Sequence, residues 1–199
     1  MTQSRKILCF AGLVVSLTLA GWFVVASRNV PKTGTEALNR AIELQEAGRY
    51  DKAVQVLQTW MKGTGRNTSH DGFLHVQIAM IYIAKAYKKP ATKDESIHEA
   101  QLNLEKSLDF VNKREPEDNS LDLDGIGGAY EVLGDLSDKE KCEFYEKAKQ
   151  AFVRQLPLIK GESYTAYGKT IPLEPVRIEI RKHLDRVNEK YPSAGCQAH

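Results

Sequence analysis

The chain has 199 residues, of which 42% are hydrophobic and 27% are charged, and its formal net charge is +2. This composition excludes collagen-like, low-complexity and fully disordered chains, and the length suits one domain with an additional tail or anchor. Arg5 and Lys6 are the only charged residues among the first 26, so basic and acidic residues balance in the remainder. A neutral domain has no overall field that attracts phosphate backbones, which argues against nucleic-acid binding.

Residues 7–26 contain no charged side chain. As a helix this segment would be about 30 Å long, which is the thickness of a bilayer's hydrocarbon core. The apolar region of a cleaved signal peptide is shorter, at ~7–15 residues, so the length favours an uncleaved anchor, with a cleaved signal as the alternative. The sequence therefore predicts an N-terminal tail at 1–6, one transmembrane helix or signal anchor at 7–26, and a linker at 27–34.

A short N-terminal tail before a first apolar segment is typical of an export signal, although the charge difference across this segment is small. We therefore expect a single-pass membrane protein with a cytoplasmic N-terminus and its folded domain on the extracytoplasmic side, in the periplasm or a lumen. A cleaved signal would make the protein periplasmic or secreted instead. In such an oxidising compartment Cys142 and Cys196 could pair, or they could remain two thiols.

Helical periodicity dominates the sequence beyond the linker. Apolar residues recur at three- and four-residue steps over 36–47 and 51–62, and the intervening residues suffice only for the turn of an antiparallel helix pair. The pattern Ile78, Ala79, Tyr82, Ala86 recurs at a fixed offset as Ile126, Gly127, Tyr130, Gly134. The same offset carries Ile97, Ala100 and Leu104 onto Tyr145, Ala148 and Phe152. Two helices that repeat together in register indicate a repeat array.

These patterns resemble the tetratricopeptide repeat, in which small residues let two helices approach and large ones fill the gap between pairs. The likeness covers about residues 34–160, and it includes the run Leu123-x-x-Ile126-Gly127-x-x-Tyr130. It implies an all-α fold of about three antiparallel helix hairpins. The amphipathic segment 173–191 would be a C-terminal capping helix, which gives a repeat domain at 35–191 and a flexible tail at 192–199. The first hairpin carries the likeness through Ala37, Ala41, Leu44, Gly48, Tyr50 and Ala53.

The segment 73–87, FLHVQIAMIYIAKAY, is apolar nearly all round, so it must be covered on more than one side. Its remaining side would face the concave surface, where members of this family hold ligands. The capping helix or the linker could instead cover that side. A second candidate is the segment 161–171, expected to be a long polar loop. The predicted partner-binding residues are Leu38, Ile42, Phe73, Val76, Met80, Ile83 and Val132 on the concave side, and Tyr164 and Tyr167 in the loop.

Catalytic and metal-binding motifs are missing from the sequence: it has no phosphate-binding loop, no nucleophile elbow and no helical histidine pair. We therefore expect no enzymatic activity, no metal and no cofactor. One weak calcium-loop pattern places oxygen-bearing side chains at the required spacing, but the same residues also fit a repeat helix. Its members are Ser120, Asp122, Asp124, Gly125 and Glu131.

Together these features predict a membrane-anchored scaffold or assembly factor that binds protein partners, namely membrane or envelope proteins, through a concave groove. Tethering at a membrane would raise the effective concentration of such partners. Two alternatives stay open at this point. The chain could be a permanent structural subunit of a membrane protein complex, or a sensor that responds to calcium or another ligand.

Overall fold

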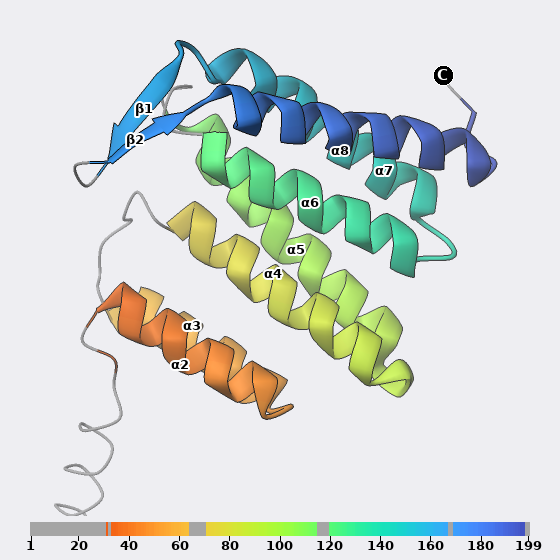
Figure 1. The fold of residues 1–199 in the computed structure, drawn as a ribbon. Helices are drawn as coiled ribbons and strands as arrows, with labels where there is room; N and C mark the ends of the chain where they lie inside the picture. Colours follow the sequence, from red (N-terminus) through yellow and green to blue (C-terminus); the bar gives the residue numbers. More distant parts are fainter. Residues whose placement is uncertain (1–30, 32, 64–70, 115–119, 167–168, 198–199) are drawn as a thin grey trace, which may run out of the picture.

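The computed structural model describes residues 31, 33–63, 71–114, 120–166 and 169–197. Almost all of them are helical (Figure 1). The α-helices are α2 (Gly34–Glu46), α3 (Tyr50–Gly63), α4 (Asp71–Lys88), α5 (Lys93–Asn112), α6 (Ser120–Leu136), α7 (Lys141–Gln155) and α8 (Glu174–Ser193). The shorter elements are the 3-10 turns η1 (Pro90–Thr92) and η3 (Leu156–Leu158) and the strands β1 (Ser163–Ala166) and β2 (Lys169–Pro172).

Three successive helix hairpins form the body of the molecule: α2 with α3, α4 with α5, and α6 with α7. Neighbouring hairpins are joined by contacts of α4 with α3 and of α6 with both α4 and α5. Helix α8 then packs against α7 and α6 (Figure 1). The predicted all-α fold class is therefore confirmed, with one small β-hairpin added to it.

The turn of the first hairpin follows directly from Gly48. This residue has a φ of 70°, the left-handed conformation that glycine adopts without steric cost. The Gly48 N–H donates to the carbonyl of Gln45 at 2.9 Å, and the Arg49 N–H donates to that of Leu44 at 2.8 Å. This pair of hydrogen bonds is the Schellman motif, which ends α2 and lets α3 begin at Tyr50.

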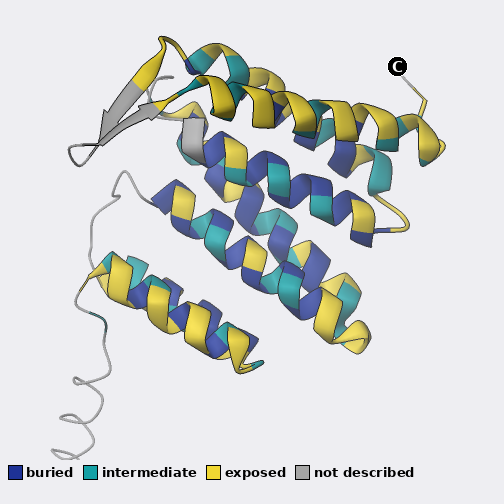
Figure 2. Cartoon of the chain, viewed as in Figure 1, coloured by how far each residue is buried: buried dark blue, intermediate teal, exposed yellow. Residues whose placement is uncertain are grey.

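Helix α4 supplies side chains to two hydrophobic clusters. Buried residues recur along its whole length (Figure 2). Leu74, Ile78 and Ile81 pack with the first hairpin, in a cluster that also contains Leu57. Other apolar residues of α4 pack with the second and third hairpins, in a cluster filled by Tyr130, Phe144 and Phe152. The prediction that segment 73–87 must be covered on more than one side is thus confirmed.

Two glycines let α6 approach α7 closely. A Cβ added to Gly127 would lie 2.6 Å from the Phe152 ring, and a Cβ on Gly134 would meet the ring of Tyr145 in the same way. Both rings are buried. The two glycines belong to the sequence pattern that repeats between the second and third hairpins, so the small residues serve the close helix contact that the pattern predicts.

The segment 161–171 is a β-hairpin, so the expectation of a long loop there is wrong. Strands β1 and β2 pair antiparallel, with Thr165 opposite Thr170, and residues 167–168 between them lie outside the described residues. Threonine, tyrosine and isoleucine favour extended backbone, which accounts for two strands in a segment whose composition is mostly polar. After β2, Leu173 donates its N–H to the carbonyl of Glu162 at 2.9 Å and the chain enters α8.

No helix in the described part of the chain is both long and apolar enough to cross a membrane. This finding contradicts the predicted localisation as a single-pass membrane protein with an extracytoplasmic repeat domain. The segment 7–26, from which it came, lies outside the described residues. The tail 1–6 and most of the linker 27–34 also lie outside them.

We predict opposite effects for alanine at two adjacent glycines of α6. Gly127→Ala should lower the free energy of unfolding by about 1–3 kcal/mol, because its methyl group would overlap the Phe152 ring. Gly128 has open space at the Cβ position, so Gly128→Ala should raise the free energy of unfolding by ~0.5–1 kcal/mol through helix propensity. Urea denaturation followed by circular dichroism measures both values. Equal effects of the two substitutions would contradict the close α6–α7 contact.

Candidate binding surface

One side of α4 is apolar and faces solvent. Phe73, Met80 and Tyr87 are 37%, 39% and 55% exposed, while most other apolar residues of the helix are buried. Their seven-residue spacing is close to two helical turns, so the three side chains lie in one row of about 21 Å. Gln77 and Ala84, between them in the row, are uncharged and partly exposed. The row therefore offers no charged side chain to a partner.

Helix α2 extends this surface. Its Ile42 is exposed, and Leu38 lines a pocket of about 300 Å³ together with Phe73 of α4 and Trp60 of α3. A Cβ on Gly34 would lie 3.1 Å from the Trp60 indole, so glycine at the start of α2 leaves room for that ring. We define the apolar strip by its five residues, Leu38, Ile42, Phe73, Met80 and Tyr87.

Two of the predicted binding residues belong to the core instead. Val76 and Ile83 are each 3% exposed and pack into the larger hydrophobic cluster. Helix α6 covers their side of α4, since a Cβ on Gly125 would lie only 2.8 Å from Val76 Cγ1. The prediction that Val76 and Ile83 face a groove is therefore wrong.

The remaining predicted site residues have different outcomes. Leu38 and Phe73 line one pocket, and Ile42, Phe73 and Met80 are exposed, so their role in binding stays a prediction. Val132 of α6 is half-buried and packs against the larger cluster, apart from the strip. The other two were the tyrosines of the segment 161–171: Tyr164 lies in β1, where its side chain is not described, and Tyr167 lies outside the described residues.

Tyr87 and Trp60 contribute to the surface but were not predicted to do so. Tyr87 could have been found, because it continues the seven-residue spacing of Phe73 and Met80 along one helix. Trp60 could not, because its place in the pocket depends on how the first hairpin meets α4. Local periodicity carries no information about that contact between hairpins.

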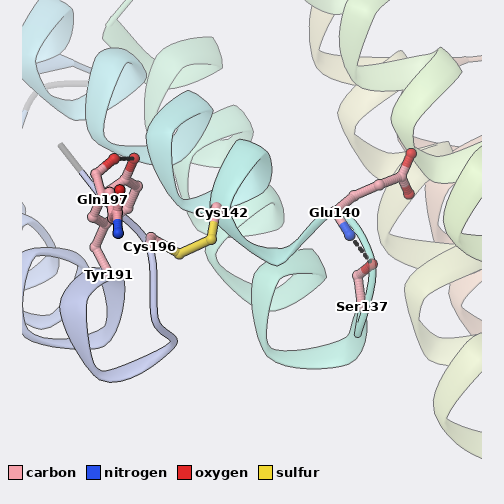
Figure 3. Close-up of a disulfide and its surroundings, with 6 residues drawn as sticks. All are labelled: Ser137, Glu140, Cys142, Tyr191, Cys196 and Gln197. Atoms are coloured by element: carbon pink, nitrogen blue, oxygen red, sulfur yellow. Dashed lines mark hydrogen bonds between the residues drawn. A yellow bond between two sulfur atoms is a disulfide. The ribbon is translucent and has the colours of Figure 1, made fainter. Parts of the chain in front are cut away.

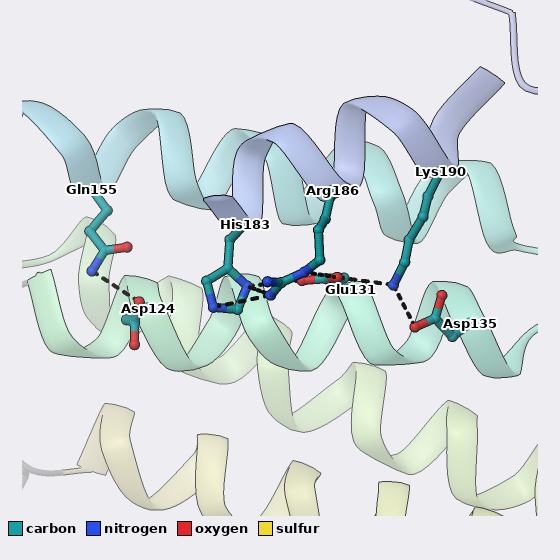
Figure 4. Close-up of polar contacts among 7 residues, drawn as sticks. All are labelled: Asp124, Glu131, Asp135, Gln155, His183, Arg186 and Lys190. Carbon is teal, nitrogen blue, oxygen red and sulfur yellow. Dashed lines mark hydrogen bonds and ion pairs between the residues drawn. The ribbon is translucent and has the colours of Figure 1, made fainter. Parts of the chain in front are cut away.

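A second feature is a buried carboxylate that contacts three basic side chains of α8 (Figure 4). Glu131 of α6 is buried and lies 3.0 Å from His183 Nδ1, and it accepts hydrogen bonds from Arg186 Nε at 3.2 Å and Lys190 Nζ at 2.9 Å. Burial raises the pKa of Glu131, but these three interactions outweigh burial and lower that pKa to about 2. Lys190 also donates to Asp135 at 2.7 Å. We call Glu131, Asp135, His183, Arg186 and Lys190 the Glu131 cluster. Its contacts join α8 to α6.

The calcium-loop interpretation of residues 120–131 is wrong. Helix α6 runs without interruption from Ser120 to Leu136, whereas a calcium loop needs its ligands on a curved backbone. Asp122 Oδ2 instead accepts a hydrogen bond from Arg114 Nη1 at 3.0 Å, and Glu131 is held by α8. Among the described residues, no three side chains of the metal-binding kind gather at one place.

Comparison of the chain with family models, with curated proteins and with solved structures finds no match. The Glu131 cluster joins two elements of the chain, while the apolar strip faces outward without a covering element among the described residues. Such a strip can bind the apolar side chains of another molecule.

The Glu131 cluster predicts a pH dependence. Because the folded-state pKa of Glu131 lies below its ordinary value of 4.5, its contribution is complete above that value and is lost as the pH falls towards 2. We expect Glu131→Gln to lower the free energy of unfolding at pH 7 by roughly 2 kcal/mol, less than the pKa difference implies because its cations are partly exposed. Chemical denaturation between pH 2 and 7 measures the effect.

The matched control is Glu189→Gln, which neutralises an exposed carboxylate of α8. It should change stability by less than ~0.5 kcal/mol at any pH. If Glu131→Gln and the wild type lost stability in parallel between pH 4.5 and 2, Glu131 would not be the group that responds.

Proposed function

We propose that the protein is a helical repeat scaffold of the tetratricopeptide type that binds a protein partner through the apolar strip. The single observation that carries this proposal is the exposed row of Phe73, Met80 and Tyr87 on a helix that buries ten of its 18 residues. A scaffold of this kind acts by holding a partner in place, so it needs a binding surface and no catalytic group.

The order of helix contacts supports the repeat type. In such arrays the first helix of each hairpin packs against the preceding hairpin, as α4 packs against α3 and α6 packs against α4 and α5. The glycines at the α6–α7 contact occupy the small positions of the repeat pattern. Helix α8 supports it further, because a polar capping helix covers the last repeat of these arrays.

The shape and chemistry of the apolar strip favour a helical partner. Aligned apolar side chains two turns apart match the anchor spacing of an amphipathic helix, which places apolar residues at steps of three, four and seven. Phenylalanine, tyrosine and methionine also offer large contact areas, and methionine adapts its shape to irregular surfaces. The pocket formed with Leu38 and Trp60 would accept one bulky side chain of such a helix.

Replacing two residues of the apolar strip should prevent binding of the partner without unfolding the domain. We expect Phe73→Asp combined with Met80→Asp to reduce capture of the partner at least about tenfold, because two charges would enter an apolar contact. A photo-crosslinking residue at position 87 in the full chain, activated in cells and followed by mass spectrometry, measures capture. Helical circular dichroism should be unchanged, because Phe73 and Met80 are both exposed.

The matched control places the same charges on a different surface. Val153→Asp with Ile178→Asp changes two apolar residues of α7 and α8 that are at least as exposed as the pair on α4. This variant should capture the partner as well as the wild-type protein does. Equal capture by both double variants, or loss of helical circular dichroism in the first, would contradict the proposal. A partner that survives purification without exchange would make the protein a permanent subunit, whereas exchange indicates a scaffold.

A further inference from the structure

The turn after α8 places Cys196 next to Cys142 (Figure 3). Gly195 has a φ of 80° and donates its N–H to the carbonyl of Pro192 at 2.9 Å, and Cys196 donates to that of Tyr191 at 3.2 Å. This Schellman motif turns the chain back after the helix. Cys142 and Cys196 then form a disulfide with their Cα atoms 5.5 Å apart and a sequence separation of 54.

One cysteine of this pair is placed to leave easily as a thiolate. Cys142 lies in the first turn of α7, which begins at Lys141. Unpaired backbone N–H groups and the helix dipole stabilise negative charge at that end of a helix, and a stabilised thiolate is a good leaving group in disulfide exchange. Both cysteines are partly exposed, so a small dithiol can reach the bond.

Apart from this bond, α8 is attached by polar contacts and by less apolar burial than α4 has. It buries two side chains, Ile180 and Val187, out of 20 residues, whereas α4 buries ten out of 18. Val176, Leu184 and Tyr191 add partly buried apolar contacts. The polar attachments are the Glu131 cluster and Arg177, which donates to the carbonyls of Ile159 and Gly161 at 3.2 and 2.8 Å. Water can replace these partners when the helix leaves, so they resist its release less than apolar burial would.

We propose that the Cys142–Cys196 disulfide is a redox latch, and that its reduction by a dithiol releases α8 from α6 and α7 while the three hairpins stay folded. This inference does not depend on the binding role of the apolar strip. Release would uncover the ring of Phe152, which is buried and lies 5.0 Å from the His183 ring, measured between centroids. It would also free Glu131, so the exposed face would be both apolar and acidic.

A dithiol reduces the bond in two thiol–disulfide exchange steps. A thiolate of the dithiol attacks Sγ of Cys196, the S–S bond breaks, and its electron pair leaves on Sγ of Cys142. The second thiolate of the dithiol then attacks the dithiol's own sulfur in the mixed disulfide and displaces Cys196 as a thiolate. The dithiol is oxidised to a disulfide, and its two electrons reduce the two cysteines, which take up protons from water according to the pH.

Hydrogen–deuterium exchange of the full chain, read by mass spectrometry, tests the latch. A Cys9→Ser background keeps the third cysteine out of the exchange. Adding dithiothreitol should speed exchange of α8 amides at least about tenfold and leave α4 and α5 unchanged. Cys142→Ser with Cys196→Ser should show the fast α8 exchange without dithiothreitol and should not respond to it.

Alkylation of free thiols in the same samples shows whether the bond was reduced while the protein was folded. Three results would overturn the latch: α8 protection unchanged after complete reduction, equal loss of protection in all helices, or a bond that dithiothreitol reduces only after global unfolding. The second result would make the disulfide a stabiliser of the whole domain. If the double serine variant does not fold, dithiothreitol titration of the Cys9→Ser protein still distinguishes these results.

Discussion

Packing around α4 is the constraint on which the rest of the molecule depends. The helix contacts α3, α5 and α6, and it joins the two hydrophobic clusters of the described residues. Ile78 packs towards the first hairpin, and Ile83 packs towards the third. With neighbours on these sides, only one side of α4 faces solvent, and Phe73 and Met80 lie there. The candidate surface is thus a consequence of where α4 lies.

The helix pairing could be predicted because both halves of each contact are visible in the sequence. Gly127 and Gly134 stand at the small positions of a repeating pattern. The large side chains that meet them, Phe152 and Tyr145, stand at the same offset from Leu104 and Ile97. Gly48 likewise marks a turn by its chemistry, since the left-handed conformation that it adopts is costly for other residues. Such signals are local or periodic, so they do not depend on the tertiary arrangement.

The binding side of α4 could be predicted only in part. Phe73 and Val76 are both large, apolar and only three residues apart, yet one is exposed and the other is buried against α6. In a helix that is apolar all round, periodicity does not say which side a neighbour covers. Glu131 shows the same limit for polar residues, because its partners His183, Arg186 and Lys190 lie far away in sequence. Only the folded arrangement of α6 and α8 brings them together.

Helix α8 is attached differently from α4. It is the last helix and one of its sides faces solvent, so it buries fewer side chains than α4 does. Besides the apolar contacts of Ile180 and Val187, its attachment uses the Glu131 cluster and a cross-link whose loop closure contributes about 4 kcal/mol in the chain-entropy model. Carboxylates and disulfides respond to pH and to reductants, whereas buried apolar contacts do not. Helix α8 is for this reason the element whose attachment solution conditions can change, while the packing around α4 stays the same.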